Sequence, residues 1–249
     1  MNLDTVVFDL GGTLIEYAGP YAVWPDLETP GFTAAYQHLN QNGWHLPEFE
    51  VFKQIGFDLL PIRWRRAAAG EQNLRLVALL AEVLQVAGVK NVSADYLTKA
   101  ATLYEAAICA QAAPIPGARE VVAQVKAAGF KLGLVSNTMF TGQAHMADMK
   151  RFGLLDYFDA LVFSADVNKW KPTAAPFLHV LAELGAEGDT AVYIGDDPGS
   201  DVVGGKRAGM RTIHFQSSQR FPEPEGVQPD AQITQLHDLL PILTRWQQS

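Results

Sequence analysis

The second half of the chain alternates between short apolar runs and helical patterns, and this alternation restricts the fold more than any other feature. Strands are predicted at residues 131–136, 160–163, 191–194 and 211–215, with a last short strand around Ile233. Helices are predicted around them, at residues 118–128, 141–152, 174–184, 202–208 and 236–246. Strands that are separated by helices pair in parallel through right-handed crossovers. The pattern therefore predicts an α/β fold with a Rossmann-like three-layer core built on a parallel sheet.

A further buried strand is predicted at the start of the chain. Residues 6–8 form a short β-branched and aromatic run that ends at Asp9. Gly11 and Gly12 then break the run, and glycines allow a tight turn whose N–H groups can face an anion. Open α/β sheets bind ligands at the carboxyl ends of their strands, which is where Asp9 lies. A surface Asp after an edge strand is the alternative interpretation of this segment when it is taken alone.

A helical block separates this first strand from the rest of the sheet. It begins with a proline-rich loop at residues 17–30, whose Tyr17, Tyr21 and Trp24 favour an ordered loop over the site. Helices are then predicted, with no strand between them, at residues 32–39, 49–60, 73–86 and 93–110. We therefore predict two domains, inserted one into the other. They are an α/β core (residues 1–16 and 115–249) and an all-helical cap above Asp9 (residues 17–114).

Composition argues against several kinds of partner. The 249 residues carry 19 Lys and Arg against 27 Asp and Glu, a net charge of −8. This charge disfavours nucleic-acid binding but is compatible with a local pocket for a small anion. The one cysteine, Cys109, rules out an internal disulfide and fits a reducing compartment. Because we find neither a signal-peptide pattern nor an apolar run of membrane-spanning length, we expect a cytoplasmic protein with no membrane partner. These features leave the oligomeric state open.

Polar side chains gather where the predicted strands end. In chain order they are Asp9, Ser136, Asn137, Lys171, Asp196 and Asp197. Because the carboxyl ends of parallel strands share one edge of the sheet, we expect these groups to converge. Asp9 and Asp196 offer the oxygen ligands that suit Mg²⁺, and Lys171 adds a positive charge at a helix start. Metal, hydroxyl, amide and ammonium groups around one carboxylate indicate phosphoryl transfer with Asp9 as the nucleophile.

Each of these residues also has a purely structural interpretation. Ser136 and Asn137 are suited to capping a turn, and a lone lysine such as Lys171 is most often solvated. Asp197 can cap the helix that follows it, and Asp201 can complement the dipole of that helix. Their combination at successive strand ends favours a functional site.

The same residues resemble the motifs of the haloacid dehalogenase-like hydrolase superfamily, in the form with a helical cap after the first strand. The resemblance covers nearly the whole chain, at Asp9 to Thr13, Ser136, Lys171, and Gly195-Asp196 through Asp201. It implies that Asp9 is the nucleophile and that Mg²⁺ binds to Asp9, the backbone carbonyl of Gly11, and Asp196. It also implies that Asp197 and Asp201 support these ligands from outside, and that the phosphoryl group is held by Gly12, Thr13, Ser136, Asn137 and Lys171. Lys169 is the second candidate for the lysine, but the Lys-Pro pair favours Lys171.

One position departs from the family pattern. Phosphatases of the superfamily usually carry a second Asp two residues after the nucleophile, where it protonates the leaving group and then activates water. Here that residue is Gly11, and loss of a general acid and base costs about 10²–10⁴-fold in rate. The enzyme then uses good leaving groups, or a substitute acid such as Glu16, Asp26, Glu28 or His45. Otherwise it is slow, or it keeps the site only for binding.

The predicted function is a Mg²⁺-dependent phosphomonoesterase that acts on a small cytoplasmic phosphorylated metabolite through an aspartyl-phosphate. A non-catalytic metal-binding or regulatory protein is the first alternative. A haloacid dehalogenase ranks lower, because a metal-free nucleophilic Asp is poorly placed among three other carboxylates. In the cap, Arg63, Arg65 and Arg66 flank Trp64. Contact with an anionic or aromatic substrate is one interpretation of this run, and a solvated helix face over a packed Trp64 is the favoured one.

Overall fold

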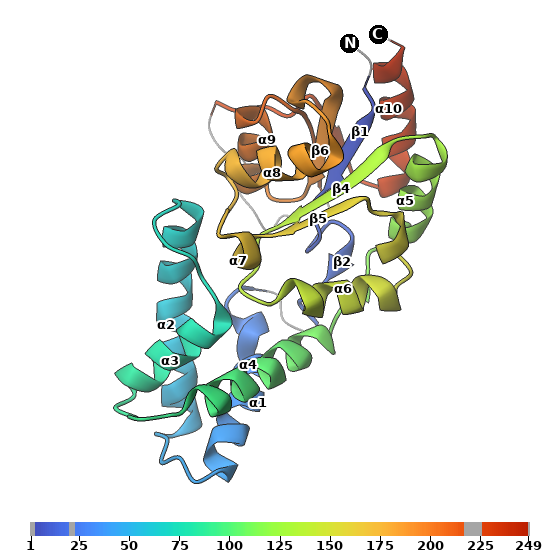
Figure 1. Cartoon of the computed structure of the whole chain (residues 1–249). Helices are drawn as coiled ribbons and strands as arrows, with labels where there is room; N and C mark the ends of the chain where they lie inside the picture. The colour runs from blue at the N-terminus through green and yellow to red at the C-terminus, as the bar shows by residue number, and fades with distance from the viewer. Residues whose placement is uncertain (1–2, 20–22, 217–225, 249) are drawn as a thin grey trace.

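The core of the protein is a six-stranded parallel sheet, seen in a computed structural model that describes residues 3–19, 23–216 and 226–248 (Figure 1). The strand order is β5-β4-β1-β6-β7-β8. The strands are β1 (Thr5–Phe8), β4 (Lys131–Ser136), β5 (Ala160–Phe163), β6 (Ala191–Gly195), β7 (Arg211–Phe215) and β8 (Ala231–Ile233). Every neighbouring pair is parallel, and β1 lies between β4 and β6 in the middle of the sheet. The predicted parallel sheet is confirmed.

Helices cover both faces of this sheet, so the core has three layers. Val6 and Phe8 point from β1 into one apolar cluster, and Val7 points into another on the opposite face. This follows from the alternation of side chains along a strand. The first face is covered by α5 (Ala118–Ala127), α6 (Gly142–Arg151) and α10 (Leu239–Gln247). The second face is covered by α8 (Ala175–Leu184) and α9 (Val203–Arg207). The predicted three-layer architecture is therefore confirmed.

The inserted region is helical, as predicted, and its apolar side chains form a buried cluster that also includes Met139, Phe140 and Trp170 from the core. Its helices are α1 (Thr29–Gln41), α2 (Phe49–Ala68), α3 (Leu76–Val86) and α4 (Ala94–Cys109). We call these four helices and the loops between them the cap. Phe32, Leu80 and Tyr104 are buried together at its centre. The domain limits predicted from the sequence remain a prediction, because the positions of helices and strands alone do not define where one domain ends and the other begins.

Two features of the insertion differ from the predicted elements. The helix predicted to end at residue 60 continues to Ala68 with Pro61 inside it. Proline removes one helical hydrogen bond, but Leu60 and Ala67 on either side are fully buried, so tertiary packing holds the helix together. In addition, β2 (Ile15–Glu16) pairs with β3 (Ala113–Pro114) in an antiparallel ribbon. The ribbon joins the two segments through which the chain leaves the core and returns.

Short helical turns complete the fold. They are α7 (Ser164–Val167), η1 (Asp26–Glu28), η2 (Leu155–Tyr157), η3 (Gly188–Thr190), η4 (Pro198–Val202) and η5 (Leu236–Asp238). In the predicted loop over the site, Tyr21 lies outside the described residues, while the Trp24 ring packs 6.0 Å from the Trp64 ring. Across the described ranges, no helix combines the length and the apolar character that crossing a bilayer requires.

Candidate active site

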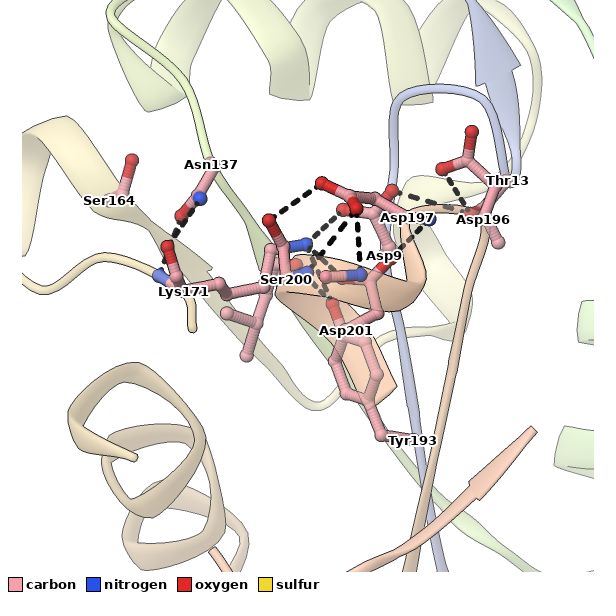
Figure 2. Close-up of polar contacts among 12 residues, drawn as sticks. Asp9, Thr13, Asn137, Ser164, Lys171, Tyr193, Asp196, Asp197, Ser200 and Asp201 are labelled. Atoms are coloured by element: carbon pink, nitrogen blue, oxygen red, sulfur yellow. Dashed lines mark hydrogen bonds and ion pairs between the residues drawn. The ribbon is translucent and has the colours of Figure 1, made fainter. Parts of the chain in front are cut away.

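The predicted polar residues meet at the carboxyl edge of the sheet (Figure 2). Asp9, Ser136 and Asp196 follow or end three adjacent strands, β1, β4 and β6, and all three residues are buried. The strands are in register, so that Phe8 lies beside Leu134 on one side and beside Ile194 on the other. The sheet itself therefore brings together three groups of which the two nearest in sequence, Ser136 and Asp196, are 60 residues apart.

Lys171 is the only cation among the described residues that bonds to these buried carboxylates. Its Nζ donates to Oδ1 of Asp9 at 2.6 Å, to Oδ1 of Asp201 at 2.7 Å and to the hydroxyl of Tyr193 at 3.0 Å. The residue is 3% exposed. Burial alone would lower its pKa, but the carboxylates of Asp201 and Asp9 outweigh burial and raise the pKa above the ordinary lysine value. The two ion pairs therefore favour the charged form of Lys171.

A cluster of carboxylates surrounds this ammonium group. Oxygen atoms of Asp9, Asp196 and Asp201 lie within 4.8 Å of one another. Burial, followed by repulsion from Asp9 and Asp201, raises the pKa of Asp196. Its buried Oδ2 has no hydrogen-bond partner among the described residues. An orphaned buried carboxylate oxygen beside two more carboxylates is the donor set that suits a hard divalent cation such as Mg²⁺.

The turn after β1 lies directly against this cluster. Gly12 has φ +81°, and a Cβ at this position would lie 2.3 Å from Oδ2 of Asp196, so that only glycine fits. The Thr13 hydroxyl is fully buried and lies 3.3 Å from Oδ2 of Asp9 and 3.4 Å from Oδ1 of Asp196. Gly11 is exposed, and a Cβ there would meet only Cδ2 of Tyr17, at 3.9 Å. The turn thus has one position, Gly12, that admits no side chain, and one position, Gly11, that has room for one.

Asn137 holds the backbone of Lys171. Its Oδ1 accepts the Lys171 N–H at 2.9 Å, and its Nδ2 donates to the Lys171 carbonyl at 3.0 Å. This pair of bonds fixes the residue from which the ammonium group extends. Ser136 is buried at the end of β4 beside it.

The two remaining acidic residues play different parts. Oδ1 of Asp197 accepts the N–H groups of Gly199 and Ser200, and its Oδ2 accepts the Ser200 hydroxyl at 2.6 Å. Asp197 therefore caps η4, as the purely structural interpretation of this residue expected. Asp201 is fully engaged from the other side, because it accepts Lys171 through Oδ1 and the Asp197 N–H through Oδ2 at 3.0 Å.

The second lysine and two arginines of the cap run bond to residues outside this site. Nζ of Lys169 contacts Nδ1 of His179 on α8. Arg63 bonds to Glu82 and Arg66 bonds to Glu71, both within the cap. The Trp64 ring packs 5.2 Å from the ring of Trp170. The packed interpretation of Trp64 is confirmed, and Lys171 rather than Lys169 is the lysine at the cluster.

The four candidates for a substitute acid have other surroundings. Oε1 of Glu16 accepts the N–H groups of Tyr17 and Ala18, both at 2.9 Å. Asp26 and His45 are exposed, and His45 belongs to the α1–α2 connection at the end of the cap remote from the sheet (Figure 1). Glu28, in η1 just before α1, is buried against the cap and accepts the Tyr104 hydroxyl at 2.9 Å. Burial raises the pKa of Glu28 to about 7, although hydrogen bonds from Tyr104 and Trp24 oppose the shift.

Tyr17, beside the open position 11, is not a free acid either. Its hydroxyl lies 3.0 Å from Nδ1 of His145, whose Nε2 is 2.7 Å from the Thr138 hydroxyl. Burial, and then the charge of Asp148, raises the pKa of the Tyr17 phenol far above its ordinary value. Burial lowers the pKa of His145 to about 4, so the imidazole is neutral at pH 7. Tyr17 and His145 thus form a neutral contact between the residue that follows β2 and helix α6.

Tyr193 belongs to the site but was not among the predicted residues. Its hydroxyl accepts from Lys171 and donates to the Val135 carbonyl at 2.8 Å. The one available signal was a hydroxyl-bearing residue inside an otherwise aliphatic buried strand, where an unpaired hydroxyl is costly.

Comparisons with known proteins show the family to which this chain belongs. A family model described as a haloacid dehalogenase-like hydrolase matches residues 3–209. Pyrimidine 5'-nucleotidase YjjG of Escherichia coli (strain K12) is 31% identical over 156 residues, 62% of this chain and 66% of that protein. The chain thus spans just under two thirds of this relative. Phosphoglycolate phosphatase of Yersinia pseudotuberculosis serotype I (strain IP32953) is 27% identical over 96% of this chain and 92% of that protein.

A solved structure extends the similarity over the whole chain. The crystal structure of a 2-haloacid dehalogenase from Pseudomonas syringae pv. Tomato DC3000 aligns with a TM-score of 0.71 at 26% identity. The alignment covers 98% of this chain and 99% of that one. Phosphatases and a dehalogenase are therefore both among the proteins that this chain resembles.

Proposed function

Because the chain belongs to the haloacid dehalogenase-like hydrolases, we propose that it is a magnesium-dependent phosphomonoesterase that acts on a small phosphorylated metabolite. The observation that carries this proposal is the buried group formed by Lys171, Asp9 and Asp201, next to Oδ2 of Asp196, which has no hydrogen-bond partner in the described part of the chain. Relatives named as a nucleotidase and a phosphoglycolate phosphatase support a small phosphorylated substrate. A cytoplasmic location also stays a proposal, supported by the single cysteine.

The metal would be held by Asp9, Asp196 and the backbone carbonyl of Gly11. The repulsion among the carboxylates and the orphaned Oδ2 of Asp196 support this ligand set. When bound, the ion would offset negative charge that accumulates during phosphoryl transfer. Asp201 is outside the proposed ligand set, because both of its oxygens already accept hydrogen bonds from Lys171 and Asp197.

The remaining residues bind and orient the phosphoryl group. A carboxylate oxygen of Asp9 attacks phosphorus, and the phosphorus–oxygen ester bond breaks. The leaving oxygen takes its proton from a donor other than residue 11, because Gly11 has no side chain. Water then attacks the aspartyl-phosphate, which releases inorganic phosphate and restores Asp9. Throughout, the Lys171 ammonium balances the phosphoryl oxygens, and Asn137 holds the lysine backbone. The Gly12 turn and the Ser136 and Thr13 hydroxyls are the further phosphate-binding groups that we propose.

An activity panel tests this proposal directly. We expect Mg²⁺-dependent release of phosphate from at least one of a set of small phosphate esters, and loss of that activity in Asp9→Asn. Asp95→Asn is the matched control, since Asp95 is an exposed carboxylate on α4. Activity that persists in Asp9→Asn identifies a contaminant. If Mg²⁺ and a phosphate mimic bind but no ester is hydrolysed, the regulatory alternative takes the place of the phosphatase.

A dehalogenase is the second candidate, favoured by the similarity to the Pseudomonas protein and by the absence of a side chain at Gly11. It would use Asp9 to displace halide from a 2-haloacid. Halide release from such an acid in the presence of EDTA decides for it. The buried acidic cluster weighs against this candidate, because without a metal ion three carboxylates share the site with the single ammonium group of Lys171 among the described residues.

A further inference from the structure

The loop between α2 and α3 contacts the core, and one of its side chains, that of Asn73, makes two hydrogen bonds there. We call residues 69–75 the docking loop; it lies beside α7 (Figure 1). Nδ2 of Asn73 donates to the Ala165 carbonyl at 2.8 Å, and its Oδ1 accepts the Trp170 indole N–H at 3.0 Å. One amide in the cap thus satisfies a carbonyl and an indole of the core segment between β5 and α8.

A second contact joins the same part of the cap to the segment after β4. The N–H of Leu76, the first residue of α3, donates to the Met139 carbonyl at 3.0 Å. The two core segments are themselves connected, because Ser164 Oγ accepts the Thr138 N–H at 2.8 Å and donates to the Thr138 carbonyl at 3.0 Å. The segment after β4 begins at Asn137, and the segment after β5 ends at Lys171. The docking loop and the first residue of α3 therefore hold these two segments at the side that faces the cap.

Trp170 transmits this contact to the candidate active site. It is 2% exposed and packs against Trp64 of α2 at 5.2 Å between ring centroids. It immediately precedes Lys171, whose backbone is held by the two bonds from Asn137. The position of the indole therefore restricts the backbone from which the Lys171 ammonium reaches Asp9.

We propose that Asn73 is a positioning residue: by bonding to both Trp170 and Ala165 it couples docking of the cap to placement of Lys171 at the nucleophile. This inference rests on the proposed function for its kinetic part only. Loss of the Asn73 side chain leaves a buried indole N–H without its acceptor, and an unsatisfied buried donor is unfavourable. The segment that ends at Lys171 then shifts or loosens until the donor finds water.

The kinetic test uses a small substrate that cannot reach far into the cap, para-nitrophenyl phosphate with Mg²⁺. We expect Asn73→Ala to lower kcat roughly tenfold, equivalent to about 1.4 kcal/mol, with a smaller change in KM. Trp170→Phe removes the donor but keeps an aromatic ring, and we expect a similar fall. Because both changes break the same bond, the double variant should lose little more than either single variant. Asn40→Ala, at an exposed position on α1, is the matched control and should leave kcat unchanged.

Amide hydrogen exchange tests the coupling without any activity. In Asn73→Ala, we expect faster exchange in the docking loop and also in residues 164–171 of the core, whereas Asn40→Ala changes neither. Faster exchange confined to the docking loop overturns the proposal, as do single-variant effects that multiply in the double variant or a kcat within twofold of wild type. If the wild-type protein hydrolyses no ester, the proposed function fails, and the exchange experiment still decides the role of Asn73.

Discussion

The open position at Gly11 gives the sharpest test of the chemistry. A Cβ at residue 11 would make only an ordinary van der Waals contact, 3.9 Å from Cδ2 of Tyr17, and the residue is exposed. Its φ lies outside the left-handed region, because Gly11 is not among the positive-φ glycines of the described chain. Gly11→Asp should therefore fold normally. Where the backbone permits the new residue, replacing glycine stabilises by about 0.4–1 kcal/mol through the unfolded state.

The expected gain in rate depends on the leaving group. A positioned general acid and base contributes about 10²–10⁴-fold, equivalent to about 3–5 kcal/mol of barrier. Aryl phosphates release a weakly basic oxygen that needs little protonation, whereas alkyl phosphates release a strongly basic one. We therefore expect Gly11→Asp to accelerate formation of the phosphoenzyme far more for alkyl than for aryl phosphates.

A series of phosphate esters of increasing leaving-group pKa measures this directly. For wild type we expect kcat/KM to fall steeply along the series, and for Gly11→Asp we expect a much shallower slope. Gly11→Asn is the matched control, because it has the same size and no proton to give at neutral pH, and it should keep the steep slope. Parallel slopes for all three proteins would refute the reasoning and would mean that the acid is supplied elsewhere or is not needed.

Three further predictions concern the buried charges. Lys171→Met removes the cation bonded to Asp9 and Asp201, and breaking a buried pair in this way should lower the free energy of unfolding by about 3–5 kcal/mol, measured by urea denaturation in EDTA; an unchanged free energy contradicts the geometry. Asp196→Asn removes a carboxylate whose pKa is raised by burial and repulsion, so this variant should melt above wild type in EDTA but gain less stability from added Mg²⁺, and a full Mg²⁺ shift in the variant excludes Asp196 as a ligand. Burial raises the pKa of Glu28 from 4.5 to about 7, so the folded state holds its proton more tightly than the unfolded state does. The free energy of unfolding should therefore fall by at most about 3 kcal/mol as pH rises from about 4.5 to 7, and Glu28→Gln should flatten this decline in pH-dependent urea melts.

The core strands could be predicted because each is a short apolar run with clear limits. β4 and β5 span Lys131–Ser136 and Ala160–Phe163, the ranges predicted from the sequence. The polar residues at their carboxyl ends converge because parallel pairing leaves no other arrangement. The choice of Lys171 over Lys169 also followed from a local feature, the proline after it.

Other contacts leave no local pattern to follow. β2 and β3 are two residues long, which is too short for any periodicity, and they pair across nearly 100 residues of inserted chain. Asn73 meets Ala165 and Trp170 only because the cap docks at one particular place, and a single asparagine in a loop predicts no partner. Asn137 was predicted as a phosphate ligand, and the structure adds that its side chain holds the Lys171 backbone. Topology follows from pattern, whereas contacts between cap and core depend on tertiary packing.

The surroundings of Gly11 narrow the substrates that suit this enzyme. Among the described residues next to it, Tyr17 has a phenol whose pKa lies too high for proton transfer at neutral pH, and its hydroxyl is already paired with His145. Glu16 uses a carboxylate oxygen to accept two backbone N–H groups, and Glu28 is buried in the cap against Tyr104. Under the proposed phosphatase function, we therefore expect the leaving group to take its proton from water or from the substrate itself rather than from these three side chains. Both sources favour phosphate compounds whose leaving oxygen is weakly basic or carries an acidic neighbour, and this is the class with which the activity panel should begin.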